Sequence, residues 1–134
     1  MKNTQFFNPH GLPGKNASLD NKSTMEDLAL LCYIFAQYPD LMKMVSTRQA
    51  DFRNRNDKNY VSLVNHNHLL PGGKYQLKGV NGIKTGFTNR AGSCVAVTYQ
   101  LNGKHLLANL AGYPSAKDRD QFARQLLLWG AERI

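Results

Sequence analysis

The chain has 134 residues, 42% of them hydrophobic, which limits it to one ordinary domain with a modest core. Its 17 Lys and Arg residues outnumber 9 Asp and Glu, giving a formal charge of +8 that favours anionic partners. The basic residues are scattered, without a recognition-helix pattern or stacked aromatics, so no nucleic-acid partner is expected. There is also no run of ~20 apolar residues that could span a bilayer.

The N-terminal third predicts a loop followed by helix. Residues 1–22 are rich in Asn, Gly and Pro, which is typical of an ordered loop. A capping box formed by Ser23 and Glu26 then predicts a helix start. Apolar residues at helical spacing predict its inward face: Leu28, Leu31, Cys32 and Phe35. Because Pro39 disfavours helix before it, we expect this helix to end near Tyr38. A short turn of helix from Asp40 to Val45 is expected to complete the helical segment 23–45.

The rest of the chain changes from irregular to strand-like and then to helical. Residues 46–79 are polar and predict irregular structure, with weak extended character at 60–64. Period-two alternation predicts strands at 80–88, 93–101 and 105–111, and Asn102-Gly103 is a strong hairpin signal. A helix is expected over 115–131, with an apolar stripe of Phe122, Leu126 and Trp129 and with Gly130 as its C′ residue. The predicted fold class is α+β, a three-stranded antiparallel meander at 80–112 flanked by an N-terminal helical segment and a C-terminal helix.

Neither cysteines nor histidines show metal-ligand spacing. Cys32 and Cys94 lie in apolar segments and are expected to be buried free thiols. His10 has no partner at ligand spacing and is interpreted as a structural loop residue. We therefore expect no metal and no cofactor.

The triplet Lys84-Thr85-Gly86, within a β-prone stretch, is the most informative motif. Lysine supplies a positive charge, threonine a hydroxyl that can hold a carboxylate, and glycine lets a ligand backbone approach a strand closely. Such a strand lines one wall of the active site in serine acyl-transferases that bind D-Ala-D-Ala peptides or β-lactams. A three-residue match alone is weak, so the neighbouring segments decide its meaning.

Five segments together resemble the C-terminal half of the D-alanyl-D-alanine carboxypeptidases, which are low-molecular-mass penicillin-binding proteins of the serine β-lactamase superfamily. They occur in the family's order and span essentially the whole chain: Asn8-Pro9-His10-Gly11-Leu12, Ser23-Thr24 with Asp27-Leu28-Ala29, Asn65-His66-Asn67-His68-Leu69-Leu70, Val80 to Thr88 with Ala91-Gly92, and Leu126-Leu127 with Trp129-Gly130. The resemblance implies a partial serine β-lactamase/DD-peptidase-like fold.

The resemblance also implies roles for individual residues. Lys84 would provide positive potential beside the nucleophile, Thr85 would bind the substrate carboxylate, and the backbone N–H of Phe87 would be one oxyanion-hole donor. Arg119 would pair with the carboxylate, the alternative being a helix-surface Arg balanced by Asp118 and Asp120. His66 stands where many relatives have Arg, and an exposed or internally satisfied His is the alternative to substrate contact.

The family's nucleophile motif, Ser-x-x-Lys, and its Ser-x-Asn motif are both absent from the printed sequence. In the family both precede the Asn-Pro-His-Gly-Leu loop, so the chain resembles the part of a catalytic domain, 1–134, that follows them. We expect the complete enzyme to trim the terminal D-Ala of peptidoglycan stem peptides through an acyl-enzyme and to bind β-lactams. The chain alone is expected to be inactive.

Two further expectations concern location and an alternative function. Relatives work outside the cytoplasmic membrane, yet residues 1–7 lack the apolar stretch of a secretory signal. The alternative is a non-catalytic module that binds cell-wall peptides or a partner protein. Such a module could form a homodimer or exchange strands, because a meander without neighbouring strands has an exposed edge.

Overall fold

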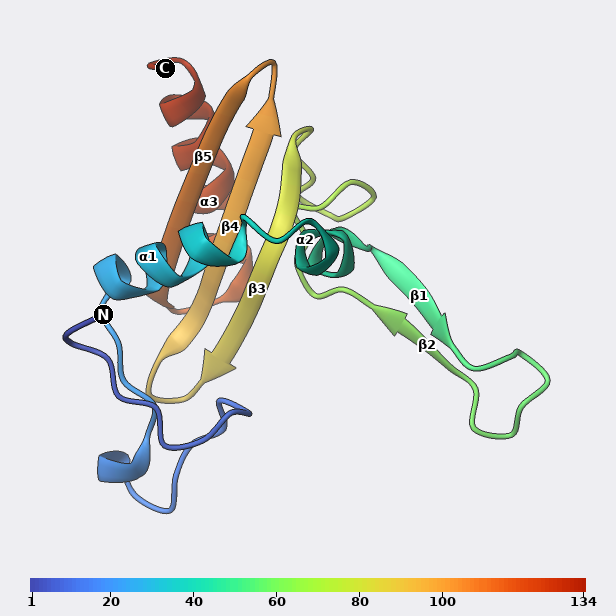
Figure 1. Cartoon of the computed structure of the whole chain (residues 1–134), viewed down its shortest axis with the longest axis horizontal. Helices are drawn as coiled ribbons and strands as arrows, with labels where there is room; N and C mark the ends of the chain where they lie inside the picture. The colour runs from blue at the N-terminus through green and yellow to red at the C-terminus, as the bar shows by residue number, and fades with distance from the viewer.

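The computed structural model describes all 134 residues. It contains a short 3₁₀ helix, three α-helices and five strands, in the order η1 (Ala17–Leu19), α1 (Met25–Phe35), α2 (Pro39–Ser46), β1 (Gln49–Phe52), β2 (Val61–Val64), β3 (Val80–Thr88), β4 (Gly92–Leu101), β5 (Lys104–Tyr113) and α3 (Ala116–Ala131). Figure 1 shows a central sheet with helices on both sides and a hairpin that projects away from it.

The central sheet is an antiparallel meander with the strand order β3-β4-β5. Its alternating apolar residues face α3 and form one core, whose members are Leu69, Leu70, Leu77, Val80, Val95, Val97, Tyr99, Ala108, Leu110, Ala123 and Leu127. On the opposite face, the side chain of Asn109 contacts the backbone of α1. The predicted α+β class and the three-stranded meander are therefore confirmed.

Helix α3 has the predicted extent, but its inward face differs from the predicted stripe. Ser115 is the N-cap, and its side chain accepts a hydrogen bond from the backbone N–H of Asp118. The buried residues of the helix are Arg119, Asp120, Ala123 and Leu127, whereas Phe122 and Trp129 are exposed. Gly130 lies inside the helix rather than at C′, because the helix continues to Ala131.

The start of α1 differs from the predicted capping box by one residue. Thr24, not Ser23, is the N-cap, and its hydroxyl accepts from the backbone N–H of Asp27 at 3.1 Å. The Asp27 carboxylate in turn accepts from the Thr4 hydroxyl at 2.7 Å. An isolated bridge between Gln5 and Lys22 brings the N-terminal segment to this position, which the local sequence pattern does not reveal.

Two corrections apply to residues 36–79. Helix α1 ends at Phe35 rather than near Tyr38, and the expected short helix follows as α2, which begins at Pro39, where proline is well tolerated in a first turn. The segment 46–79 is not wholly irregular, because β1 and β2 pair as an antiparallel hairpin whose eight residues are all exposed. In Figure 1 this hairpin extends away from the sheet.

Much apolar surface is left uncovered. Only 21 of 134 residues are buried, and the exposed large apolar side chains include several on α1, namely Leu30, Leu31, Tyr33 and Ile34. The predicted inward face of α1 is thus only partly covered, with Cys32 buried and Leu31 exposed. None of the helices has the length and apolarity that a bilayer crossing requires.

Candidate functional site

The Lys84-Thr85-Gly86 triplet lies within β3, an edge strand of the meander. Its register pairs Lys84 with Ala96 and Gly86 with Cys94 on β4. The other side of β3 has no neighbouring strand. Lys84 and Gly86 are exposed and Thr85 is half-buried, so a ligand can reach the triplet from the open edge.

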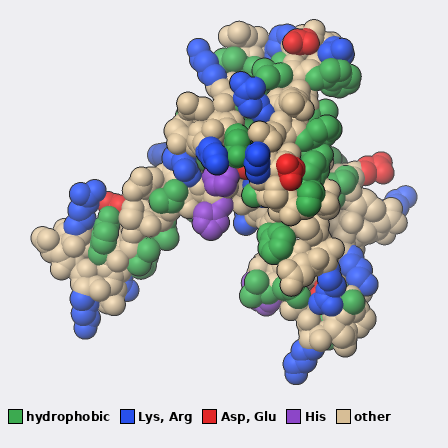
Figure 2. Space-filling model, turned by 180° about the vertical axis from the view of Figure 1, so that it is seen from behind, with side chains coloured by type: hydrophobic (Ala, Val, Ile, Leu, Met, Phe, Trp, Pro, Cys, Tyr) green, Lys and Arg blue, Asp and Glu red, His purple; other side chains and the backbone are tan.

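A groove of about 580 Å³ runs along this edge, and we call it the strand-edge groove. It is lined by Lys84, Thr85, Gly86 and Phe87 from β3, His66 and His68 from the segment after β2, Ser93 from β4, and Pro114, Ser115, Ala116 and Arg119 at the start of α3. Figure 2 shows histidine side chains next to Lys and Arg side chains where the hairpin joins the rest of the molecule. All six residues that the sequence predicts for the site therefore line one groove.

Gly86 is not required by the backbone or by packing. Its φ is not positive, and a Cβ added at this position would meet no atom within 4 Å. Gly82, four residues earlier on the same strand, differs because an added Cβ would lie 2.9 Å from Val45 and 3.2 Å from Met42 of α2. The glycine at 86 therefore leaves open space on the solvent side of the strand, where a ligand backbone could approach.

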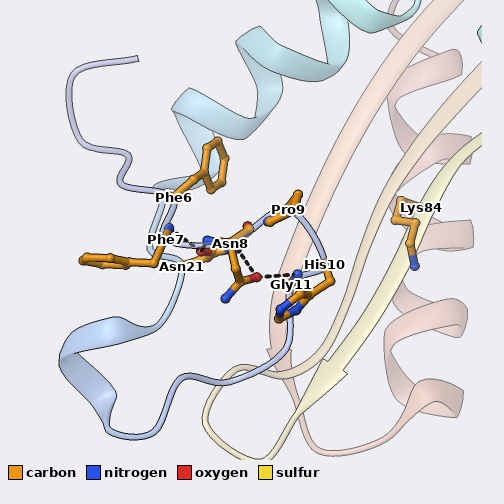
Figure 3. A pocket seen from close by; sticks show the side chains of 8 residues that line it. All are labelled: Phe6, Phe7, Asn8, Pro9, His10, Gly11, Asn21 and Lys84. Carbon is orange, nitrogen blue, oxygen red and sulfur yellow. Dashed lines mark hydrogen bonds between the residues drawn. The ribbon is translucent and has the colours of Figure 1, made fainter.

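Lys84 belongs to a second hollow as well as to the strand-edge groove. This hollow, of about 680 Å³, is lined by Lys84 and by residues of the N-terminal segment: Phe6, Phe7, Asn8, Pro9, His10, Gly11 and Asn21. In Figure 3 Lys84 comes from β3, across the hollow from the loop that contains His10. Its ammonium group donates to the carbonyl of Thr85. Lys84 thus lies between two open spaces at the sheet edge.

The loop across from Lys84 is held by side-chain amides. Asn8 accepts from the backbone N–H of Gly11 at 2.8 Å, and Asn21 accepts from the N–H of Phe7 at 2.7 Å (Figure 3). His10 Nδ1 accepts from the N–H of Leu12 at 3.0 Å. These bonds explain why the loop that contains His10 is ordered without a helix or strand of its own.

Arg119 is not on the helix surface, so that alternative is wrong. Its side chain is 4% exposed, and Nε and Nη2 donate to one carboxylate oxygen of Asp120 at 2.8 and 2.7 Å. Nη1 donates to the carbonyl of Cys94 at 3.1 Å. The guanidinium is therefore held at the back of the strand-edge groove by a buried ion pair.

The sequence pattern predicts no role for His68, and it indicates Asp120 only as a residue that could balance Arg119. His68 Nδ1 lies 2.9 Å from the second carboxylate oxygen of Asp120, which is fully buried. The two residues are 52 positions apart. The only local indication that His68 belongs to the site was its place in the segment Asn65 to Leu70, which resembles the family.

The lining of the groove contains basic side chains and no acidic one. Lys84 and Arg119 are cationic, and the N-terminal turn of α3 presents its positive dipole end at Ser115 and Ala116. No group of three or more His, Cys, Asp or Glu side chains is placed to hold a metal ion. Cys32 is buried, Cys94 is half-buried, and both are free. The arrangement suits an anionic organic ligand.

The meander with helices on both faces and the Lys-Thr-Gly motif on its edge strand is the architecture of the penicillin-binding, DD-peptidase fold class. A family model described as D-alanyl-D-alanine carboxypeptidase matches residues 1–112. The chain belongs to this family.

Individual relatives agree with this assignment. The D-alanyl-D-alanine carboxypeptidase DacA of Haemophilus influenzae is 32% identical over 132 residues, which are 97% of this chain and 30% of that protein. Penicillin-binding protein D2 of Listeria monocytogenes, solved in an ampicillin-bound form, matches with a TM-score of 0.76 and 26% identity over 92% of this chain and 47% of that one. A D-alanyl-D-alanine carboxypeptidase DacD structure from Francisella tularensis shares the fold, with a TM-score of 0.78 and 22% identity, over 94% of this chain and 40% of that one. The chain spans about 30% of the length of the curated relatives it matches.

Proposed function

We propose that residues 1–134 form the Lys-Thr-Gly wall and adjoining groove of a serine-type D-Ala-D-Ala carboxypeptidase. In the complete enzyme a serine oxygen attacks the carbonyl carbon of the penultimate D-Ala, the C–N bond breaks, and the terminal D-Ala leaves with a proton. Water then hydrolyses the ester and restores the serine. The observation that supports this proposal is that Lys84, Thr85, Gly86, Phe87, Arg119 and His66 line one groove at an open strand edge.

Each residue has a proposed task within that reaction. Lys84 supplies positive charge beside the serine, and the Thr85 hydroxyl holds the terminal carboxylate of the peptide. The backbone N–H of Phe87 is one donor to the developing oxyanion, an interaction worth roughly 2.7–4 kcal/mol when the nucleophile is present. Arg119 adds positive potential from the back of the groove, and His66 contacts the peptide at its rim.

None of the serines of this sequence has Lys three residues later, and we propose that a segment outside the sequence supplies the nucleophile. The uncovered apolar side chains of α1 support packing against such a segment, since the core of this chain leaves them exposed. We therefore propose that the 134-residue chain by itself forms no acyl-enzyme. We further propose that the complete protein acts on peptidoglycan outside the cytoplasmic membrane.

Fluorescent penicillin tests both parts of the proposal. The purified chain is expected to give no covalent band after denaturation, whereas a fusion of the preceding part of the Haemophilus influenzae relative to this chain is expected to give one. In that fusion Lys84→Gln should reduce labelling at least tenfold, and Lys78→Gln, which changes an exposed lysine outside the groove, should not. A labelled isolated chain would refute its inactivity, and a folded, unlabelled fusion would refute the site.

The two free edges of the meander favour a second candidate, a non-catalytic module that associates with itself. In the order β3-β4-β5, both β3 and β5 lack an outer neighbour, and β5 is ten residues long. Unpaired edges of this length can template pairing with another chain. Light scattering tests this candidate: a dimer that Ala111→Pro, at an exposed position of β5, converts to a folded monomer would support it, and a wild-type monomer with no peptide affinity would exclude it.

A further inference from the structure

His68 connects the strand-edge groove to a carboxylate that has no access to solvent. Its Nδ1 lies 2.9 Å from Oδ2 of Asp120, whose side chain is 0% exposed, while the His68 side chain is 38% exposed and lines the groove. The reaction proposed above gives this pair no task. The hydrogen bond nevertheless fixes the orientation of the His68 imidazole, because the Asp120 carboxylate is fully buried and cannot turn toward solvent.

The other hydrogen bonds of Asp120 determine which ring nitrogen of His68 carries a proton. Oδ1 of Asp120 accepts from both Nε and Nη2 of Arg119, so the carboxylate forms an ion pair with a buried guanidinium. An ionised carboxylate can only accept, and therefore Nδ1 of His68 must donate. Nε2 then carries an accepting lone pair in the neutral ring, and it is a second N–H donor in the imidazolium. No protein group bonds to Nε2.

The groups around His68 come from several segments. Asp120 and Arg119 face it from α3, Lys84 shares the groove lining from β3, His66 lies two residues before it, and the Tyr75 ring packs edge-on with centroids 6.3 Å apart. Of these, only Asp120 is acidic. A ligand carboxylate in the groove would therefore add a second negative group near the ring and favour its protonated form.

We propose that Nε2 of His68 binds the anionic end of a peptide ligand in the strand-edge groove, and that Asp120 is the positioning residue that holds the imidazole for this contact. The choice of ligand, a peptide ending in a D-Ala carboxylate, rests on the proposed function. This contact is strongest with a protonated imidazole, because a charge-assisted hydrogen bond then joins Nε2 to the ligand carboxylate.

The orientation of His68 can be measured without any ligand. NMR of the ¹⁵N-labelled 134-residue chain distinguishes the two imidazole tautomers. We expect His68 in the Nδ1–H form and His10 in the opposite Nε2–H form, because His10 Nδ1 accepts from the Leu12 N–H. In Asp120→Asn the preference of His68 should weaken. If that variant does not fold, the wild-type tautomer still decides, and an Nε2–H form of His68 would overturn the role of Asp120.

The ligand contact is tested by titrating the same chain with N-acetyl-D-Ala-D-Ala at about pH 5.5 and about pH 8, on either side of an ordinary imidazole pKa. We expect affinity about three- to tenfold higher at the lower pH, as one charge-assisted hydrogen bond would give. His68→Gln should abolish this dependence, and His105→Gln, an exposed histidine on β5, should retain it. The readout is the shift of the amide signals of residues 84–86.

The outcomes separate this inference from the proposed function. Shifts at residues 84–86 that are equal at both pH values, with the His68 pKa unchanged by ligand, would overturn the His68 contact and leave the groove assignment intact. An absence of shifts at any pH would overturn binding by the groove and the His68 contact together, but not the orientation of His68 by Asp120, which the tautomer decides.

Discussion

Nη1 of Arg119 donates to the backbone carbonyl of Cys94 at 3.1 Å, and Cys94 is the residue that pairs with Gly86 across the β3–β4 ladder. Helix α3 is thereby bonded to the strand directly behind the Lys-Thr-Gly triplet. Because Arg119 is also paired with the buried Asp120, the position of the wall depends on a charged contact rather than on apolar packing alone.

The first prediction concerns this buried pair. Arg119→Met removes the cation and leaves Asp120 buried with only His68 as partner, so the free energy of unfolding should fall by about 3–5 kcal/mol. Urea denaturation followed by circular dichroism measures the loss. Arg124→Met, at an exposed position of the same helix, is the matched control and should change the free energy by less than about 0.5 kcal/mol. Equal effects of the two substitutions would mean that the pair does not stabilise the fold.

The inward face of α3 shows where sequence reasoning reached its limit. Apolar spacing selected Phe122, Leu126 and Trp129, but the buried positions include Arg119 and Asp120. A charged residue is ordinarily expected at the surface, and its burial is tolerated only when it has a partner. Arg119 is paired with Asp120, and the second partner of Asp120 is His68, which lies 52 positions away in the sequence. The pattern therefore gave the extent of the helix and missed its orientation.

The strands and the triplet were predictable because their signals are local. Alternation of apolar residues and the Asn102-Gly103 turn determine strand boundaries within a few residues, and β3 has the predicted bounds. The β1–β2 hairpin was missed because its short strands lie among many polar residues and none of its strand residues is buried. The contribution of His68 to the groove depends on a tertiary contact with α3, which no local pattern reports.

The second prediction compares two glycines of β3. Gly86→Ala adds a methyl group where no atom lies within 4 Å, so the free energy of unfolding should change by less than about 1 kcal/mol. The affinity for N-acetyl-D-Ala-D-Ala should nevertheless fall, because the methyl group occupies the open side of the strand. Thermal unfolding and calorimetric titration measure the two quantities.

Gly82→Ala is the matched substitution and should behave in the opposite way. Its added Cβ would lie 2.9 Å from Val45 and 3.2 Å from Met42, and overpacking of this kind costs about 1–3 kcal/mol. If Gly86→Ala were the more destabilising of the two, the glycine of the triplet would be a packing requirement and not a feature of the groove.

The third prediction concerns the thiols. Burial raises the pKa of the Cys32 thiol, so less thiolate is present at a given pH, whereas Cys94 is only half-buried. Iodoacetamide at mildly alkaline pH should therefore modify Cys94 well before Cys32 in the folded chain. Mass spectrometry of peptides measures the order, and the same reaction in urea should make the two rates similar. Faster modification of Cys32 in the folded state would contradict the packing of α1 on the sheet.

The fourth prediction concerns acid stability at the start of α1. The hydrogen bond from the Thr4 hydroxyl, aided by the backbone N–H of Asn3, lowers the pKa of Asp27. A lowered native pKa means that the unfolded state binds the proton more readily, so the stabilisation is present above the ordinary carboxyl pKa and is lost as the pH falls through the native value. The melting temperature should therefore decrease below about pH 4, and Asp27→Asn should reduce that decrease.

Thr4→Val provides the control for this contact, because it removes the hydroxyl and leaves the carboxyl. It should bring the pKa of Asp27 closer to its ordinary value, so that less stability is lost on acidification than in the original chain. Asp51, whose pKa is lowered chiefly by the Tyr60 hydroxyl in the projecting hairpin, contributes to the same acid range. Tyr60→Phe therefore separates the two contributions. An unchanged pH profile in both Thr4→Val and Asp27→Asn would show that the N-terminal segment is not held to α1 by this carboxylate.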